Sequence, residues 1–173
     1  MSIDQNKGEK HINYPYLPEG QQYNYVPASN PYMTEAKAYA LEHSLDRDFP
    51  TASVVVQDGV VIGQAANGSD YHTTKPCERK LRGSPSGQEY ELCEGCHPKN
   101  HSEVKAVAQA RANGLATEGA DLYLWGHWWC CQPCWDAMLA GGIKNVYLLE
   151  GSEITFNQPR TPKVSPPVAK PQQ

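Results

Sequence analysis

Long apolar runs and an excess of basic residues are both missing from this sequence. No window of the 173 residues comes near the roughly 18 uninterrupted apolar residues of a transmembrane helix. The formal net charge is −4 and the isoelectric point is about 5.8, which argues against the basic surface of a nucleic-acid-binding protein or an anionic-membrane binder. We therefore expect no membrane partner, and the charge disfavours a nucleic-acid partner.

An apolar leader is missing from the N-terminal segment MSIDQNKGEKHINYPY, so we expect a cytoplasmic protein whose thiols stay reduced. Cysteine is absent outside residues 77–134, the 58 residues that hold all six. Six cysteines in a small secreted chain would predict disulfides. Two Cys-x-x-Cys pairs in a reducing compartment favour metal ligation instead.

The prolines are distributed in the opposite way. Four of the fourteen lie in residues 1–31 and five in residues 151–173. Because proline interrupts backbone hydrogen-bond ladders, residues 1–31 are predicted to form an extended Tyr/Pro-rich arm, which docks on the domain or on a neighbouring subunit or stays free. Residues 158–173 have the composition of a disordered tail. Residues 32–157 are then predicted to be one domain.

The first half of this domain predicts a helix and a hairpin. An apolar repeat of helical spacing begins at Met33 and ends at Leu41. Two β-branched runs follow, at 52–57 and 60–65, and the Asp58-Gly59 dipeptide between them is typical of a tight β-turn.

The second half alternates helices and strands. A helix is predicted over 104–112, a strand over 121–125, a helix over 132–140 and a strand over 143–149. A strand, a short helix and a strand predict a parallel pair joined by a right-handed crossover. Together with the hairpin, this pattern predicts an α/β sheet with helices on both faces.

Four residues carry a metal motif at the starts of the two predicted helices, namely His101, Glu103, Cys131 and Cys134. One imidazole and two thiolates suit Zn²⁺ and leave its fourth position for water, which is the pattern of a catalytic site. Glu103 is the expected proton carrier between that water and a substrate. The alternative is a purely structural zinc site.

The pattern matches the H-x-E…P-C-x-x-C signature of zinc nucleobase deaminases. Here it consists of His101-Ser102-Glu103 and Cys131-x-x-Cys134, and Cys130 replaces the usual proline. In that chemistry, water replaces the amino group of a base and ammonia leaves.

Residues 33–149 resemble the cytidine and deoxycytidylate deaminase superfamily, with the strongest likeness to deoxycytidylate (dCMP) deaminases. The resemblance rests on the helix–hairpin start, Asn67-Gly68, the two metal motifs, the AGGIKNVYL segment, and a stretch with Cys77-x-Arg79, Pro85-Ser86-Gly87 and Glu91-Leu92-Cys93. It implies a three-layer α/β/α cytidine-deaminase-like fold with a mixed central sheet. It also implies conversion of dCMP to dUMP, a nucleotide substrate, catalytic zinc and a homo-oligomer.

The resemblance assigns one further substrate contact, Asn67, and the chain departs from the family pattern at Ser102 and at the two tryptophans before the cysteine pair. Asn67 would hold a sugar hydroxyl, although Asn-Gly is also an ordinary turn dipeptide. Ser102 stands beside the reacting base where the family usually has alanine. Trp129, and its neighbour Trp128, would stack on a base or pack in the core.

The polar segment 67–100 is predicted to be a long loop, and such loops are usually functional or clamped. Three of its cysteines remain, Cys77, Cys93 and Cys96, and together with His97 they predict a second, structural zinc ion. His72 is the alternative fourth ligand. Free thiols, or a disulfide between Cys77 and Cys93, are the alternatives to a metal.

The same loop concentrates basic residues at Lys75, Arg79, Lys80 and Arg82. Such a cluster suits a phosphate-bearing substrate, with Arg79 as the first choice for a bidentate contact. A solvated charged surface is the alternative.

Two other functions remain open from the sequence. One is deamination of a different base, such as free cytidine or deoxycytidine, guanine, or a base in single-stranded nucleic acid. The other is a non-catalytic zinc-binding module that interacts with partners through its tyrosine-rich arm.

Overall fold

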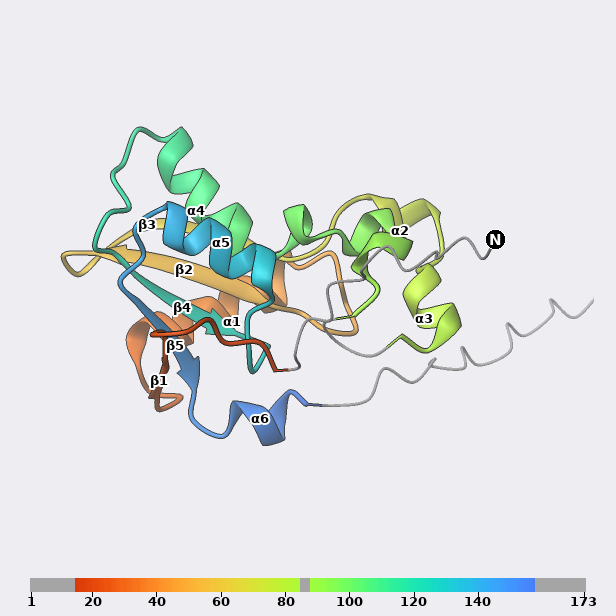
Figure 1. Ribbon diagram of the computed structural model, residues 1–173, viewed down its shortest axis with the longest axis horizontal. Coiled ribbons are helices and arrows are strands. Elements are labelled where there is room, and N and C mark those ends of the chain that lie inside the picture. The colour runs from red at the N-terminus through yellow and green to blue at the C-terminus, as the bar shows by residue number, and fades with distance from the viewer. Residues whose placement is uncertain (1–14, 85–87, 158–173) are drawn as a thin grey trace, which may run out of the picture.

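A computed structural model describes residues 15–84 and 88–157 of the chain. Its centre is a five-stranded sheet with the strand order β1-β5-β4-β2-β3. Helix α1 covers one face of the sheet and helices α4 and α5 cover the other (Figure 1). The β1–β5 and β5–β4 pairs are parallel and the β4–β2 and β2–β3 pairs are antiparallel, so the predicted three-layer α/β/α fold with a mixed sheet is confirmed.

The strands are β1 (Tyr23–Val26), β2 (Ala52–Gln57), β3 (Val60–Ala66), β4 (Asp121–Trp125) and β5 (Asn145–Leu149). The helices are α1 (Pro31–His43), α2 (Tyr71–Thr74), α3 (Glu78–Arg82), α4 (Ser102–Ala112), α5 (Gln132–Ala140) and α6 (Ser152–Thr155). Among the described residues, no helix has the length and apolar character that crossing a membrane requires.

The predicted hairpin of β2 and β3 turns at Asp58-Gly59. Both residues have positive φ, 50° and 77°, as a two-residue primed turn requires. Side chains alternate along β2, so Val54 packs on the α1 side with Met33, whereas Val55 packs on the opposite side with Ala106 of α4. The central strand therefore contributes to both cores.

Helix α1 begins at a side-chain cap. Asn30 Oδ1 accepts hydrogen bonds from the backbone N–H groups of Tyr32, at 3.0 Å, and Met33, at 3.1 Å. Pro31 occupies the first turn, where a missing N–H costs no helical hydrogen bond.

Helix α4 packs very closely on β3, because Gly63 has no side chain. A Cβ at Gly63 would lie 2.5 Å from the backbone oxygen of Ala106. This close approach fixes the height of α4 above the sheet, and with it the position of the residues at the start of the helix.

The predicted parallel pair joined by a helix is confirmed. Strand β4 and helix α5 have the predicted bounds, and β5 begins at Asn145, two residues later than expected. The parallel pairing of β4 with β5, which places Leu122 beside Val146, requires α5 to cross over the sheet between them.

The N-terminal segment adds a strand that the sequence analysis did not predict. Residues 23–26, assigned there to an extended arm, pair in parallel with β5 at the edge of the sheet. Four residues in a Pro- and Tyr-rich context show too little alternation to indicate a strand. The predicted arm residues 1–14 and the predicted tail 158–173 lie outside the described residues.

The segment 67–100 contains no strand among its described residues and only short helical turns. Besides α2 and α3 it has three single 3₁₀ turns, at Tyr90–Leu92, Glu94–Cys96 and Pro98–Asn100. It projects from the end of the sheet at which α4 begins (Figure 1).

Candidate active site

The predicted metal ligands lie at the starts of the two helices that share one face of the sheet. His101 is the N-cap residue of α4, and Cys131 is the N-cap residue of α5. Cys134 follows in the first turn of α5. Because α4 and α5 pack against each other, their N-termini bring two motifs together that lie thirty residues apart in the sequence.

The three ligand atoms form a compact triangle. His101 Nδ1 lies 3.5 Å from Cys131 Sγ and 3.4 Å from Cys134 Sγ, and the two sulfurs are 3.4 Å apart. Tetrahedral zinc, with Zn–S of about 2.3 Å and Zn–N of about 2.0 Å, separates neighbouring ligand atoms by roughly 3.5–3.8 Å. The donor set and the spacing therefore fit Zn²⁺ with one coordination position left over.

The surroundings of the triangle favour the thiolate form of Cys131, which is the form that binds a metal. The hydrogen bond that joins it to Cys134, helped by His101, lowers the pKa of Cys131 to about 6, although burial opposes this shift. Burial raises the pKa of Cys134. Burial would lower the pKa of His101, but Cys131 and Glu103 raise it overall.

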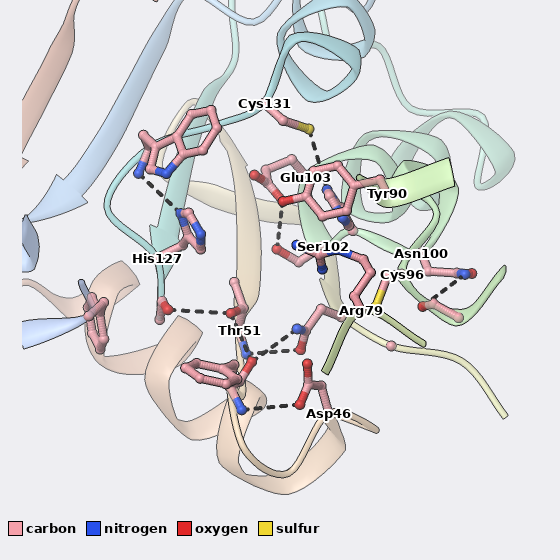
Figure 2. A pocket seen from close by; sticks show the side chains of 18 of the residues that line it. Asp46, Thr51, Arg79, Tyr90, Cys96, Asn100, Ser102, Glu103, His127 and Cys131 are labelled. Carbon is pink, nitrogen blue, oxygen red and sulfur yellow. Dashed lines mark hydrogen bonds between the residues drawn. The ribbon is translucent and has the colours of Figure 1, made fainter. Parts of the chain in front are cut away.

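Glu103 lies beside the triangle and is only 5% exposed. Ser102 Oγ donates a hydrogen bond to Glu103 Oε2 at 3.1 Å (Figure 2). A hydroxyl has one hydrogen, so Ser53 must donate the 2.8 Å bond that joins it to Ser102 Oγ. Two fully buried serines thus orient the carboxylate.

Glu103 and two of the predicted ligands, His101 and Cys131, line the same solvent-open pocket. Figure 2 shows Glu103, Ser102 and Cys131 on one side of the pocket, His127 across from them and Asp46 at the far end. The pocket is lined by segments distant in the sequence, including the 44–51 loop, the 67–100 segment and the residues after β4.

Asn67, the predicted sugar ligand, lines this pocket and also hydrogen-bonds to one of its walls. Its side-chain oxygen accepts hydrogen bonds from Ser44 Oγ and from the Thr51 backbone N–H, and its amide donates to the Phe49 carbonyl. The residue therefore fixes the loop that supplies Phe49 and Thr51 to the pocket.

Arg79 also lines the pocket and is fully buried. Its Nε donates to the carbonyl of Gln88 at 3.0 Å, and its guanidinium lies 4.4 Å from the centroid of the Tyr90 ring. The other clustered cations differ from it, since Lys75 and Arg82 are exposed and Lys80 forms an ion pair with Asp48.

Trp129 is 2% exposed and belongs to the core beneath α4 and α5, with part of its surface on the pocket. Trp128 is less buried and lines the same pocket. Ser102 contributes to the pocket lining, but its hydroxyl is engaged by Ser53 and Glu103.

Tyr90, His127 and Thr51 are among the pocket residues to which the sequence gave no role. Tyr90 stacks edge-on against His101, with centroids 4.7 Å apart. His127 Nδ1 accepts a 3.2 Å hydrogen bond from the Trp129 backbone, and Thr51 faces the same space. Isolated residues in loops carry no periodicity, so only the Gly-His-Trp-Trp context of His127 could have pointed to the pocket.

The three cysteines of the 67–100 segment also lie together, but with a different histidine from the one first predicted. Cys77, Cys93 and Cys96 lie together with His72, which was the alternative ligand. His97 instead accepts a hydrogen bond at Nδ1 from the backbone of Lys99. His97 directly follows Cys96, and the chain turns there so that the ring points along the next 3₁₀ turn rather than at the thiols.

Comparison with known proteins supports a specific family. The sequence model of the cytidine and deoxycytidylate deaminase zinc-binding region matches residues 28–150, which include every residue of the triangle. No curated protein sequence matches the chain.

Several solved structures are similar at low identity. A dCMP deaminase from cyanophage S-TIM5 is 20% identical, with a TM-score of 0.47 over 73% of this chain and 87% of that chain. Guanine deaminase from Bacillus subtilis is 21% identical, with a TM-score of 0.43 over 73% and 69%. A diaminohydroxyphosphoribosylaminopyrimidine deaminase/reductase from Thermotoga maritima is 22% identical, with a TM-score of 0.43 over 68% of this chain. This chain covers only 28% of that bifunctional protein.

Proposed function

The chain belongs to the cytidine and deoxycytidylate deaminase family of zinc-binding hydrolases that act on C–N bonds, and on that basis we propose that it deaminates a cytosine nucleotide, dCMP, to dUMP with release of ammonia. The observation that carries the proposal is the placement of the Glu103 carboxylate beside the His101–Cys131–Cys134 triangle on the pocket wall.

Each residue of this group has a distinct task. His101, Cys131 and Cys134 would hold the zinc ion, which supplies Lewis-acid activation of a water molecule. Glu103 would accept one proton from the attacking water and deliver it to the ring nitrogen of the base, and would then pass the second water proton to the amino group, so that ammonia leaves and a carbonyl remains. Ser102 and Ser53 keep the carboxylate oriented during both transfers.

A buried cation in the pocket wall supports a phosphate-bearing substrate. Arg79 is fully buried, stacked on Tyr90 and bonded through Nε to Gln88, so its guanidinium is held in one orientation. A fixed planar guanidinium suits bidentate phosphate binding, whereas the exposed Arg82 has no such support.

Other residues of the pocket wall are suited to the sugar and the base of the nucleotide. One amide hydrogen of Asn67 bonds to Phe49, and the second is available for a sugar hydroxyl. Trp128 and Trp129 provide aromatic surface for the base.

A substrate panel tests this function. The full chain is assayed for ammonia release with dCMP, CMP, deoxycytidine, guanine and a cytosine oligonucleotide. We expect dCMP to have the highest kcat/KM. Activity on guanine alone, or on the oligonucleotide alone, would contradict the dCMP assignment. Absence of ammonia release from every compound, in a preparation that contains zinc, would contradict the deaminase function and favour a binding module.

A further inference from the structure

The described residues of the segment 69–100 have no large apolar core of their own. Their buried cluster consists of Cys77, Cys93 and Cys96, and among these described residues only Tyr71 and Tyr90 pack against it as partly buried apolar side chains. Helices α2 and α3 have four and five residues, which is too short for helices to be stable alone. Something other than hydrophobic burial must therefore hold these turns together.

The three cysteines and one histidine bring four metal-binding atoms together. His72 Nε2 lies 3.1 Å from Cys93 Sγ, and Cys77 Sγ lies 3.5 Å from Cys96 Sγ. All four atoms lie within 4.8 Å of one another. The four ligands come from three turns, with Cys93 and Cys96 both at the second 3₁₀ turn, so a single ion would tie α2, α3 and that turn together.

The backbone leaves room for the histidine at this cluster. A Cβ at Gly95 would lie 2.5 Å from His72 Nε2 and 2.7 Å from its Cε1. Any other residue at position 95 would displace the imidazole from the thiols. The Cys93-Glu94-Gly95-Cys96 turn therefore combines ligand spacing with space for the fourth ligand.

The charge of the surroundings also suits a thiolate-rich metal complex. Three thiolates, one neutral imidazole and Zn²⁺ carry a net charge of about −1. Arg79 is permanently cationic, is fully buried and interacts with Cys96. A buried cation and a buried anionic complex compensate each other's charge. Protonated thiols without a metal would give the Arg79 cation no such compensation from this cluster.

We propose that His72, Cys77, Cys93 and Cys96 bind a second Zn²⁺, which is structural because all four tetrahedral positions are taken by protein. Four Cys and His ligands close the coordination shell and leave no position for water, in contrast to the three-ligand triangle of the active site. This ion stabilises the 69–100 segment by contributing its binding energy to folding.

The location of this site gives it a second consequence, for the shape of the pocket. Tyr90 lies between two metal ligands in the sequence and packs edge-on against the imidazole of His101. The Cys96 backbone also lies close enough to His101 to affect its electrostatics, and His101 Nδ1 faces the other pair of thiols. The second ion thus holds the residues that orient a ligand of the first.

Zinc stoichiometry tests the proposal independently of deaminase activity. Native mass spectrometry of the full chain is expected to show two zinc ions in the wild type, one in Cys93→Ser and one in Cys134→Ser. His97→Ala is the matched control, because this histidine is adjacent to the cluster but outside it, and it should retain two ions.

Each outcome decides the question. One zinc ion in the wild type that is lost in Cys134→Ser overturns the second site, as does retention of two ions in Cys93→Ser. If Cys93→Ser does not fold, the number of zinc ions in Cys134→Ser still decides. That variant lacks one ligand of the active-site triangle, so an ion that it retains is bound at the second site. A protein with two ions but no activity on any base would contradict the proposed function and leave the second site supported.

Discussion

The ring of Tyr90 stands edge-on against the imidazole of His101, with ring centroids 4.7 Å apart and an interplanar angle of 74°. The same ring lies 4.4 Å from the guanidinium carbon of Arg79. One aromatic side chain thus joins the cysteine-rich segment, the predicted phosphate ligand and a predicted zinc ligand. Tyr90 therefore links the pocket wall to the metal triangle through direct side-chain contacts.

Replacing this ring should weaken both contacts. Tyr90→Leu is expected to lower the free energy of unfolding by roughly 1–3 kcal/mol, because an edge-on aromatic pair and a cation–π contact are both lost. It should also raise KM for the nucleotide. Chemical denaturation and steady-state kinetics measure the two effects. Tyr90→Phe keeps the ring and should behave like the wild type, and an equal loss in both variants would contradict the stacking role.

The carboxylate of Glu103 is expected to be needed for turnover but not for metal binding. Glu103→Gln keeps the size of the side chain and removes its ability to carry a proton, so kcat should fall by at least about 10²-fold. Zinc content should be unchanged, because Glu103 is not part of the triangle. Ammonia release and metal analysis on the same preparation check this. Loss of zinc along with activity would show that Glu103 acts as a ligand instead.

The hydroxyl of Ser102 should affect the rate more than substrate binding. Ser102→Ala removes the donor to Glu103 Oε2, and a hydrogen bond to a charged group contributes about 1.5–3 kcal/mol. We expect kcat to fall by roughly tenfold or more with KM nearly constant. Ser53→Ala keeps the Ser102–Glu103 bond and should have the smaller effect. A change in KM alone would assign Ser102 to substrate binding.

Arg79 should discriminate nucleotide from nucleoside. Arg79→Gln is expected to lower kcat/KM for dCMP by at least about tenfold while changing that for deoxycytidine less, because only dCMP has the phosphate. Arg82→Gln is the matched control from the same helix, with an exposed side chain. Equal losses for both substrates would indicate that Arg79 acts only by supporting the fold.

The hydroxyl of Tyr23 fastens the N-terminal strand to the start of α5. It accepts hydrogen bonds from the Cys130 backbone N–H at 2.9 Å and from Trp135 Nε1 at 3.1 Å, and donates to the Tyr16 carbonyl. Tyr23→Phe leaves two donors without this acceptor, so the free energy of unfolding should fall by about 1–3 kcal/mol. Tyr25→Phe, at an exposed position of the same strand, should be neutral in the same denaturation experiment. Equal stability of Tyr23→Phe and wild type would contradict this anchoring role.

Much of the fold follows from local patterns in the sequence. The Asp58-Gly59 turn, the span of β4 and the bounds of α5 agree with the prediction because turn chemistry and apolar periodicity act over a few residues. The strand at 23–26 does not follow from such patterns. Its stability comes from pairing with β5 and from the Tyr23 hydroxyl, contacts with residues more than a hundred positions away.

The sequence by itself determined the candidate chemistry, because a His-x-Glu and a Cys-x-x-Cys at helix starts offer the ligands and the acid–base group that zinc-assisted deamination needs. Only the tertiary structure decided which side chains meet. Adjacent Cys96 and His97 point in different directions, so His72, brought in by the α2 turn, joins the cysteines instead. Spacing in sequence limits which ligands are possible, whereas the direction of each side chain depends on how the whole chain packs.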